Sequence, residues 1–157
     1  MIAVDIDGVR FNYRVAAVCI DEDHVLLNRI AGMDFWFLPG GRCEVRETSA
    51  ESLVREMQEE LGVTARVERL LWFVENFFES PSQLYHEIGL YYKVLLPAGS
   101  SGSDKQREYQ SRTESGDDAV FRWFPLDALR TITLVPAFLR QGLQLLPAHP
   151  EYLVTRS

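Results

Sequence analysis

Residues 48–61 restrict the fold of this chain more than any other segment, because the sequence marks both ends of a helix there. Thr48 is followed three residues later by Glu51, the spacing of a capping box at a helix N-terminus. Gly62 suits the left-handed position that ends a helix. At about 100° per residue, the apolar side chains between these ends share one face roughly 100° wide, which must pack on another element. These side chains are Ala50, Leu53, Val54, Met57 and Leu61.

Apolar and β-branched runs dominate the rest of the chain and predict strands. The polar segment 97–119 contains almost no apolar residue and is expected to be a loop. Toward the C-terminus, 126–130 favours a helical turn, and 135–146 favours a helix with Pro136 in its first turn. Many strands with two helices predict a mixed sheet covered by helices. The expected strands are 13–20, 24–30, 35–38, 63–78, 84–95 and 120–124.

The length of 157 residues predicts a single domain over residues 1–157, long enough to bury a core without disulfides. Cys19 and Cys43 match no zinc or redox spacing, so we expect two unpaired thiols in a cytoplasmic protein. No leader pattern and no apolar stretch of about 18 residues is visible, so we expect no membrane partner. An apolar strand such as Leu70–Val74 is a candidate surface for a homodimer.

Acidic residues outnumber basic ones by 23 to 16, which gives a net charge of −7. Proteins that bind nucleic acids without regard to sequence need a basic surface that displaces counterions, so a nucleic-acid partner is not expected. An acidic chain can still act on an anionic substrate if a metal ion lies between the two negative charges.

Three glutamates, Glu56, Glu59 and Glu60, lie along one flank of the predicted apolar helix face. Their i, i+3 and i+4 spacing makes them neighbours, at a cost of a few tenths of a kcal/mol per like-charged pair, and Arg55 offsets part of this repulsion through Glu59. A solvated acidic face and a site for a hard divalent cation both fit this pattern. The glycine pair in 38–41 lets a backbone carbonyl or amide approach a ligand closely, and it favours the site without deciding the question.

The segment 41–63, GRCEVRETSAESLVREMQEELGV, resembles the Nudix box, G-x5-E-x7-R-E-U-x-E-E-x-G-U with U a bulky apolar residue. The flanking sequences LPGG (38–41) and RWFPLDAL (122–129) are similar to the usual surroundings of that box. The resemblance covers most of the chain. The fixed positions are matched by Gly41, Glu47, Arg55, Glu56, Met57, Glu59, Glu60, Gly62 and Val63.

The resemblance implies an α+β fold, the α/β/α sandwich of Nudix hydrolases, with a mixed β-sheet between helices. It implies hydrolysis of the diphosphate linkage of a nucleoside diphosphate joined to another moiety, with Mg²⁺ or Mn²⁺ as cofactor. The substrate would be a small nucleotide-type molecule. The metal ligands it implies are the Gly40 carbonyl and the carboxylates of Glu56, Glu59 and Glu60.

The same resemblance makes Glu47 and Arg55 orienting residues of a catalytic group that includes Glu56 and Glu59. We expect Glu59 to be the general base. Two residues outside the box are candidates for substrate contact: Arg29, because its guanidinium can fork onto a phosphate, and Glu114, which is also the alternative base.

A different class of function, a non-catalytic sensor that binds a nucleotide through the same fold, stays open. Sensor domains of this kind commonly lose box glutamates, and this chain keeps them all. Oxidised nucleoside triphosphates, nucleotide sugars or ADP-ribose, dinucleoside polyphosphates and capped RNA ends are not distinguished by the sequence.

Strand alternation singles out further side chains with two interpretations each. One of Trp36 and Phe37 should face the core, and the other is free to stack on a base. His86 and Glu87 should point to opposite faces, with Glu87 either lining a pocket or satisfied within the strand. The segment 4–9 resembles the aspartate motif of haloacid-dehalogenase phosphatases, but a hairpin turn at Asp7-Gly8 fits the rest of the chain better.

Overall fold

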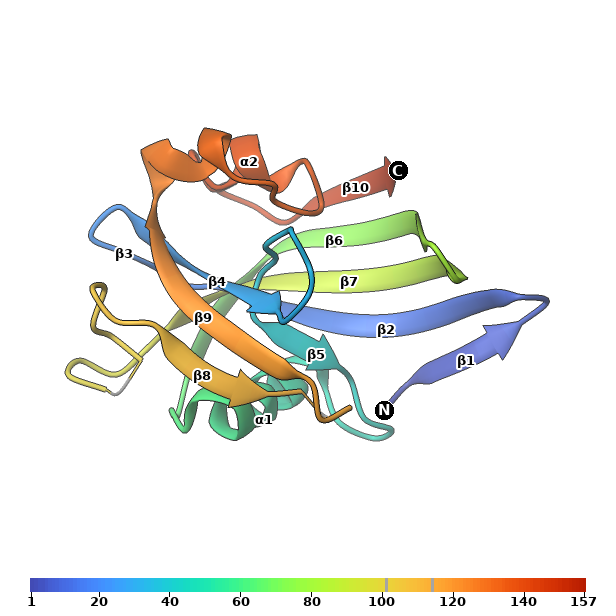
Figure 1. Cartoon of the computed structure of the whole chain (residues 1–157), viewed down its shortest axis with the longest axis horizontal. Helices are drawn as coiled ribbons and strands as arrows, with labels where there is room; N and C mark the ends of the chain where they lie inside the picture. Colours follow the sequence, from blue (N-terminus) through green and yellow to red (C-terminus); the bar gives the residue numbers. More distant parts are fainter. Residues whose placement is uncertain (101, 114) are drawn as a thin grey trace.

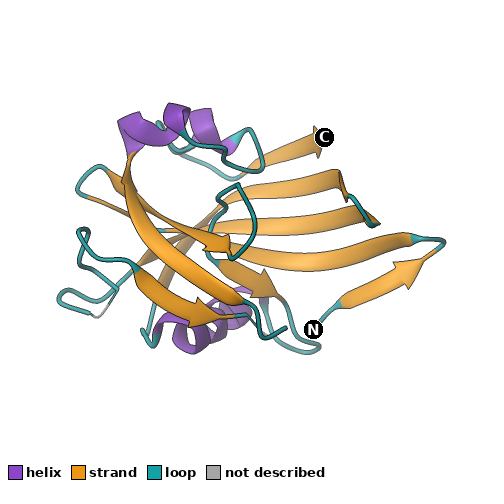
Figure 2. Ribbon diagram, in the orientation of Figure 1, coloured by secondary structure: helices purple, strands orange, loops and turns teal. Residues whose placement is uncertain are grey.

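The computed structural model describes residues 1–100, 102–113 and 115–157. Two β-sheets form its centre, with helix α1 (Ser49–Leu61) on one side and η1 (Leu126–Thr131) and α2 (Leu139–Gly142) on the other (Figure 1). Strands make up most of the molecule, and Figure 2 shows how little of it is helical. The mixed sheet between helices that the sequence predicts is confirmed.

The larger sheet has six strands in the order β1-β2-β7-β6-β10, with β5 paired to β2. It is mixed, because β2 runs parallel to β7 and β10 runs parallel to β6, while the other pairs are antiparallel. Its strands are β1 (Ala3–Ile6), β2 (Val9–Val18), β5 (Gly40–Arg42), β6 (Arg66–Ser80), β7 (Gln83–Leu95) and β10 (Glu151–Arg156).

The smaller sheet is antiparallel, in the order β3-β4-β9-β8. It crosses in front of the larger sheet in the view of Figure 1. Its strands are β3 (Ile20–Asp21), β4 (His24–Ile30), β8 (Tyr109–Arg112) and β9 (Asp118–Pro125).

Two apolar clusters fill the two sides of the larger sheet, and neighbouring residues of β2 alternate between them. Val15 packs in the cluster that contains Leu53 of α1, and Ala16 packs in the cluster that contains Leu139 of α2. This alternation follows from the two-residue period of a strand. It places α1 and α2 on opposite faces of one sheet.

Helix α1 begins and ends where the sequence predicts. The Glu51 backbone N–H donates to Thr48 Oγ1 at 3.2 Å, and the Thr48 N–H donates to the Glu51 carboxylate at 2.8 Å, which completes the capping box. Gly62 ends the helix with φ 67° and ψ 25°. Because residues with a side chain rarely adopt that conformation, glycine is favoured there.

The buried face of α1 differs from the predicted one. Ala50 and Val54 are only half-buried, and the buried face is turned toward the carboxylate flank. The cause is the loop before the helix, which packs across that flank and covers Glu56. The buried residues of α1 are Ser49, Ser52, Leu53, Glu56 and Met57.

The largest departures from the sequence predictions lie outside the centre. The predicted loop 97–119 contains β8, a polar edge strand that pairs with β9 and shows no apolar alternation. The predicted strand 35–38 forms only isolated bridges, and the predicted helix 135–146 is reduced to the four residues of α2. The Val135 N–H donates to the Trp36 carbonyl at 2.9 Å, which ties this segment to an extended neighbour and delays the helix.

Other local predictions have mixed outcomes. The turn at Asp7-Gly8 is confirmed: both residues have positive φ and join β1 to β2 as a hairpin. Both cysteines are free and buried. The predicted dimer strand Leu70–Val74 is wrong, because Leu71, Trp72 and Val74 are at most 2% exposed. Strand β10 was not predicted at all.

No helix within the described residues is both long enough and apolar enough to cross a lipid bilayer.

We predict that Thr48→Ala lowers the free energy of unfolding by about 1 kcal/mol, because the first turn of α1 loses the side-chain acceptor of its capping box. For a domain of this size the melting temperature should fall by about 2–4 °C. Thr64→Ala is the matched control, since its hydroxyl makes only a 3.5 Å contact with Gln58. Equal melting temperatures for the two variants would contradict a stabilising role for the cap.

Candidate functional site

The glycine pair before α1 brings the loop backbone close to a buried carboxylate. A Cβ atom on Gly41 would lie 2.3–2.5 Å from the carboxylate atoms of Glu56, too close for any side chain. A Cβ on Gly40 would lie 2.0 Å from the Val15 carbonyl oxygen on β2. Glycine at both positions therefore lets β5 fit between β2 and the carboxylate flank of α1.

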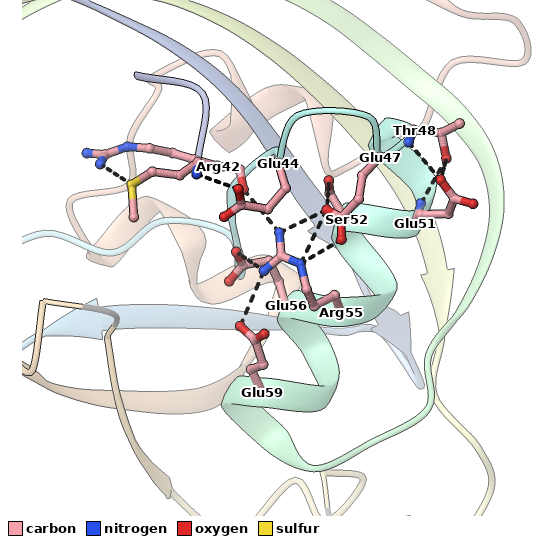
Figure 3. Close-up of polar contacts among 10 residues, drawn as sticks. Arg42, Glu44, Glu47, Thr48, Glu51, Ser52, Arg55, Glu56 and Glu59 are labelled. Atoms are coloured by element: carbon pink, nitrogen blue, oxygen red, sulfur yellow. Dashed lines mark hydrogen bonds and ion pairs between the residues drawn. The ribbon is translucent and has the colours of Figure 1, made fainter. Parts of the chain in front are cut away.

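Arg55 is the centre of the carboxylate group, as Figure 3 shows. Its Nε donates to Glu47 Oε1 at 3.0 Å, and its Nη1 lies 3.0 Å from Glu56 Oε1 and 3.3 Å from Glu59 Oε2. Its Nη2 donates to the Arg42 carbonyl at 3.3 Å and to Glu47 Oε2 at 3.1 Å. One guanidinium thus joins three carboxylates to the backbone of β5.

Glu47 is fixed by both an ion pair and a hydroxyl group. Ser52 Oγ donates to Glu47 Oε2 at 2.6 Å, beside the three hydrogen bonds from Arg55. Hydrogen bonds from Arg55 and then from Ser52 lower the pKa of Glu47 below its ordinary value. The ionised form is therefore favoured, and the pair of Glu47 and Arg55 locks the loop onto the helix.

The three box glutamates of α1 differ in their access to solvent. The Glu56 side chain is 5% exposed and Glu60 is half-buried, whereas the Glu59 side chain is 50% exposed. Glu59 forms its ion pair with Arg55 at the longer distance of 3.3 Å. Of the three carboxylates, Glu59 is thus the one that a water molecule or a ligand can reach most freely.

The Gly40 carbonyl lies on the same side of β5 as this group. The Pro39 carbonyl and the Cys43 N–H both bond to β2, and the Arg42 carbonyl accepts from Arg55 on the other side. Backbone groups alternate in direction along a strand, so the Gly40 carbonyl points to the side of the Arg42 carbonyl. The backbone and α1 both contribute oxygen atoms to this region.

These oxygen donors suit a hard divalent cation such as Mg²⁺. Glu47, Glu56 and Glu59 together have three negative charges against the single positive charge of Arg55, so the group has negative charge in excess. Within the described residues no three acidic, histidine or cysteine side chains already converge as a metal cage. The oxygen donors therefore fit a divalent cation by their chemistry. In this structure Arg55 lies between the carboxylates.

The two substrate candidates outside the box are not part of this group. Arg29 stacks over the Trp36 ring, with its Cζ 4.6 Å from the ring centroid, on the same face of β4 as Leu27. Glu114 lies outside the described residues. Trp36 is the core-facing member of its pair, at 3% exposed, and the half-exposed Phe37 contacts Arg14 instead.

A second polar group, which the sequence pattern alone does not reveal, crosses the larger sheet. Asn12, Glu87, Asn76 and Thr155 are cross-strand neighbours on β2, β7, β6 and β10, and Thr155 donates to Asn76 Oδ1 at 2.5 Å. Asn12, Glu87 and Asn76 are each less than 8% exposed. The only sequence signal was the position of each residue on the polar side of its strand, and the register between strands joins them.

Glu87 is a buried acid within this polar row. Burial raises its pKa above the ordinary value, and the Arg14 charge and hydrogen bonds with Asn12 and Asn76 offset this only in part. His86 lies on the opposite face, between Phe11 and Phe77, so the predicted divergence of these two neighbours is confirmed.

The family comparison matches most of this chain. A model described as the NUDIX domain matches residues 10–146. This range contains the whole carboxylate group and the glycine pair. It leaves out strands β1 and β10.

Two curated proteins share long segments with the chain. YjhB of Bacillus subtilis (strain 168), provisionally named an ADP-ribose pyrophosphatase, is 37% identical over 109 residues, which cover 69% of this chain and 47% of YjhB. An RNA pyrophosphohydrolase of Halorhodospira halophila (strain DSM 244 / SL1) is 45% identical over 60 residues, 38% of this chain and 33% of that protein. The matches span less than half the length of these relatives.

Solved structures share the architecture. A UDP-X diphosphatase superposes with a TM-score of 0.60 and 26% identity, covering 90% of this chain and 66% of that one. A MutT protein from Bacillus halodurans superposes with a TM-score of 0.62 over 85% of this chain and 80% of its own, at 18% identity, which is a likeness of fold.

We predict that Gly41→Ala destabilises the protein by about 1–3 kcal/mol, because the new methyl group overlaps the Glu56 carboxylate and forces it away from Arg55. Urea unfolding measures the change. Gly102→Ala is the matched control, since a Cβ there makes only ordinary contacts of 3.5 Å or more. A Gly41 variant as stable as this control would contradict the close approach.

We predict that Glu87→Gln raises the melting temperature at pH 7–8 and that the gain disappears as the pH falls toward 4.5. The raised pKa means that the folded chain keeps a proton that the unfolded chain has already released, so the wild-type protein loses stability as the pH rises through that interval. Glutamine keeps the amide hydrogen bonds and removes the buried charge. A variant less stable than wild type at pH 8 would instead show that the attraction of Arg14 outweighs burial.

Proposed function

The chain belongs to the NUDIX family, and on this premise we propose that it hydrolyses the diphosphate linkage of a nucleoside diphosphate joined to another moiety. The observation that supports this most directly is the group of Glu47, Glu56 and Glu59 around Arg55, beside the Gly40-Gly41 backbone. The relatives named ADP-ribose pyrophosphatase, RNA pyrophosphohydrolase and UDP-X diphosphatase support hydrolysis at a diphosphate.

We infer that a divalent cation, Mg²⁺ or Mn²⁺, is held by the carboxylates of Glu56, Glu59 and Glu60 and by the Gly40 carbonyl. When bound there, the cation would polarise phosphoryl oxygens and lower the pKa of a bound water. The excess negative charge around Arg55 supports this assignment, because the same charge would repel a diphosphate that arrived alone.

Arg55 and Glu47 act as positioning residues in this proposal. The guanidinium holds Glu56 and Glu59 at 3.0 and 3.3 Å, so both carboxylates keep a fixed orientation on α1. Glu47 and Ser52 hold the guanidinium in turn. Charge-assisted hydrogen bonds of this kind are stronger than neutral ones and fix geometry.

Glu59 is the proposed general base that accepts the proton of the attacking water. Its side chain is half exposed, and its ion pair with Arg55 is the longest of the three glutamate contacts, so the carboxylate is accessible to water. Glu56, at 5% exposed, is less suited to that role. Arg29, with its guanidinium near the end of β4, is proposed to contact a phosphate of the substrate.

The substrate is proposed to be a small nucleotide derivative. With a net charge of −7, the chain has few means of binding the backbone of a long nucleic acid. A single half-buried strand-end arginine, Arg29, suits the phosphate of a small molecule better than an extended anionic polymer.

The test is release of nucleoside monophosphate or phosphate from a panel of nucleotides with and without MgCl₂. ADP-ribose, a UDP-sugar, nucleoside triphosphates, a dinucleoside polyphosphate and a 5′-triphosphorylated RNA cover the classes. We predict turnover of at least one small nucleotide, abolished by EDTA. Tight binding of a nucleotide with no product from any of them would favour the sensor interpretation and overturn the proposal.

We predict that Glu59→Gln lowers kcat on the preferred substrate by about 10²- to 10⁴-fold, because the amide cannot accept the proton, while the thermal unfolding curve changes little. Glu68→Gln, an exposed glutamate on β6 that pairs with Lys93, is the matched control and should keep wild-type kcat. Full turnover by the Glu59 variant would remove this residue from the role of base.

A further inference from the structure

The larger sheet has one apolar face that α1 covers only in part. Helix α1 packs over Val15 and its neighbours at one end of β2, and the strands extend well beyond it (Figure 1). On the same face, large apolar side chains from three further strands are between 49% and 62% exposed. They are Val4, Ile6, Leu84, Tyr152 and Val154, and together with the rings described next they form what we call the apolar sheet face.

The strand register proves that these residues share one face. Val4 pairs with Phe11, Phe11 with His86, and His86 with Phe77, across β1, β2, β7 and β6. Paired residues of neighbouring strands point to the same side of a sheet. The other side of these strands has the polar row from Asn12 to Thr155, next to the stacked rings of Phe78 and Tyr85, so the two faces differ in polarity.

Ring contacts join the side chains in the middle of the apolar sheet face. His86 contacts Phe11 edge to face with ring centroids 5.4 Å apart and stacks on Phe77 at 4.4 Å. Arg156 of β10 lies over the Phe77 ring, with its Cζ 4.3 Å from the centroid. Aromatic side chains held this way lose little entropy on association, and such side chains are the usual centre of a protein interface.

The footprint of the face is about half of one side of a standard dimer interface. Five strands at about 4.8 Å spacing, with same-face residues about 6.7 Å apart along each strand, give a footprint on the order of 20 Å by 20 Å. This flat footprint is on the order of 400 Å² and leaves out the added area of protruding side chains. A standard interface buries roughly 800 Å² per partner. An apolar patch of this extent is about as large as the largest patch on a typical monomer, and such patches are often functional.

The charges on this face fit a second copy of the same chain. Glu75 and Glu79 of β6 lie near one side of the face and Arg156 of β10 lies close by. In a two-fold interface the same surface meets itself, so the arginine of one copy can meet an acid of the other. Arg156 is the sole arginine or lysine among the described side chains of this face, which disfavours an anionic membrane or a nucleic acid as the occupant.

We propose that two copies of this chain associate through the apolar sheet face, sheet against sheet, as a homodimer. The proposal does not depend on the catalytic assignment, since no carboxylate around Arg55 takes part. Sheets packed face to face lie about 10 Å apart and interdigitate side chains such as those of Leu84 and Val154.

The test is sedimentation equilibrium of the full chain. The wild-type protein should sediment at twice the mass of one chain at about 100 μM, and the double variant Leu84→Asp/Val154→Asp should raise the dissociation constant at least about 100-fold and sediment as one chain. Leu145→Asp is the matched control: Leu145 is 86% exposed but lies after α2, away from this face, and its variant should remain a dimer.

Circular dichroism and a thermal melt establish that each variant is folded, and Ile6→Lys on the edge strand β1 is a second, single substitution that should also give one-chain mass. A wild-type protein that sediments as one chain at about 100 μM overturns the proposal, as does a double variant with the mass of the control. A one-chain wild type that sediments with phosphatidylserine vesicles would overturn it in favour of a membrane surface.

Discussion

The structure depends on one guanidinium group. Arg55 joins Glu47 of the loop, Glu56 and Glu59 of α1 and the Arg42 carbonyl of β5, with distances of 3.0–3.3 Å. Without it, the adjacent carboxylates would repel one another, and the largely buried Glu56 would lose an ion pair at 3.0 Å. The same contacts hold the loop, the edge strand and the helix in a single arrangement. Arg55 therefore offsets the repulsion among the three carboxylates that surround it.

That arrangement needs specific neighbours, which explains the sequence around it. Gly41 has no side chain because the Glu56 carboxylate occupies the space, and the capping box of Thr48 and Glu51 sets where α1 begins relative to the loop. The helix ends at Gly62, so its carboxylates occupy a fixed length of one flank. A local sequence motif thus determines a three-dimensional group, since most of its contacts join residues fewer than fifteen positions apart.

This locality is why the sequence predicted the helix ends and the Arg55 ion pair better than the margins of the fold. The helix ends, the Arg55 ion pair and the Asp7-Gly8 turn depend on neighbouring residues, and the structure contains all three. Strand β10 depends on a distant partner, β6, and strand β8 is polar with no apolar alternation, so no local pattern reveals either strand. The rotation of the buried face of α1 has the same origin, because the covering loop is not visible on a helical wheel.

The polar row through Glu87 also depends on strand pairing that the sequence of one strand does not reveal. Alternation placed His86 and Glu87 on opposite faces, but only the register of four strands brings Asn12, Asn76 and Thr155 beside Glu87.

The α1 side of the larger sheet has a covered end and an uncovered end, and their separation follows from β2. At its C-terminal end, near Val15, β2 pairs with β5 and lies beneath α1, where the carboxylate group forms. At its N-terminal end, near Phe11, α1 no longer covers the apolar side. A strand of ten residues is longer than the width of one helix, roughly 10–12 Å, so one helix cannot cover it. Association through the uncovered part would bury apolar surface while the exposed Glu59 stays open to solvent at the other end of the sheet.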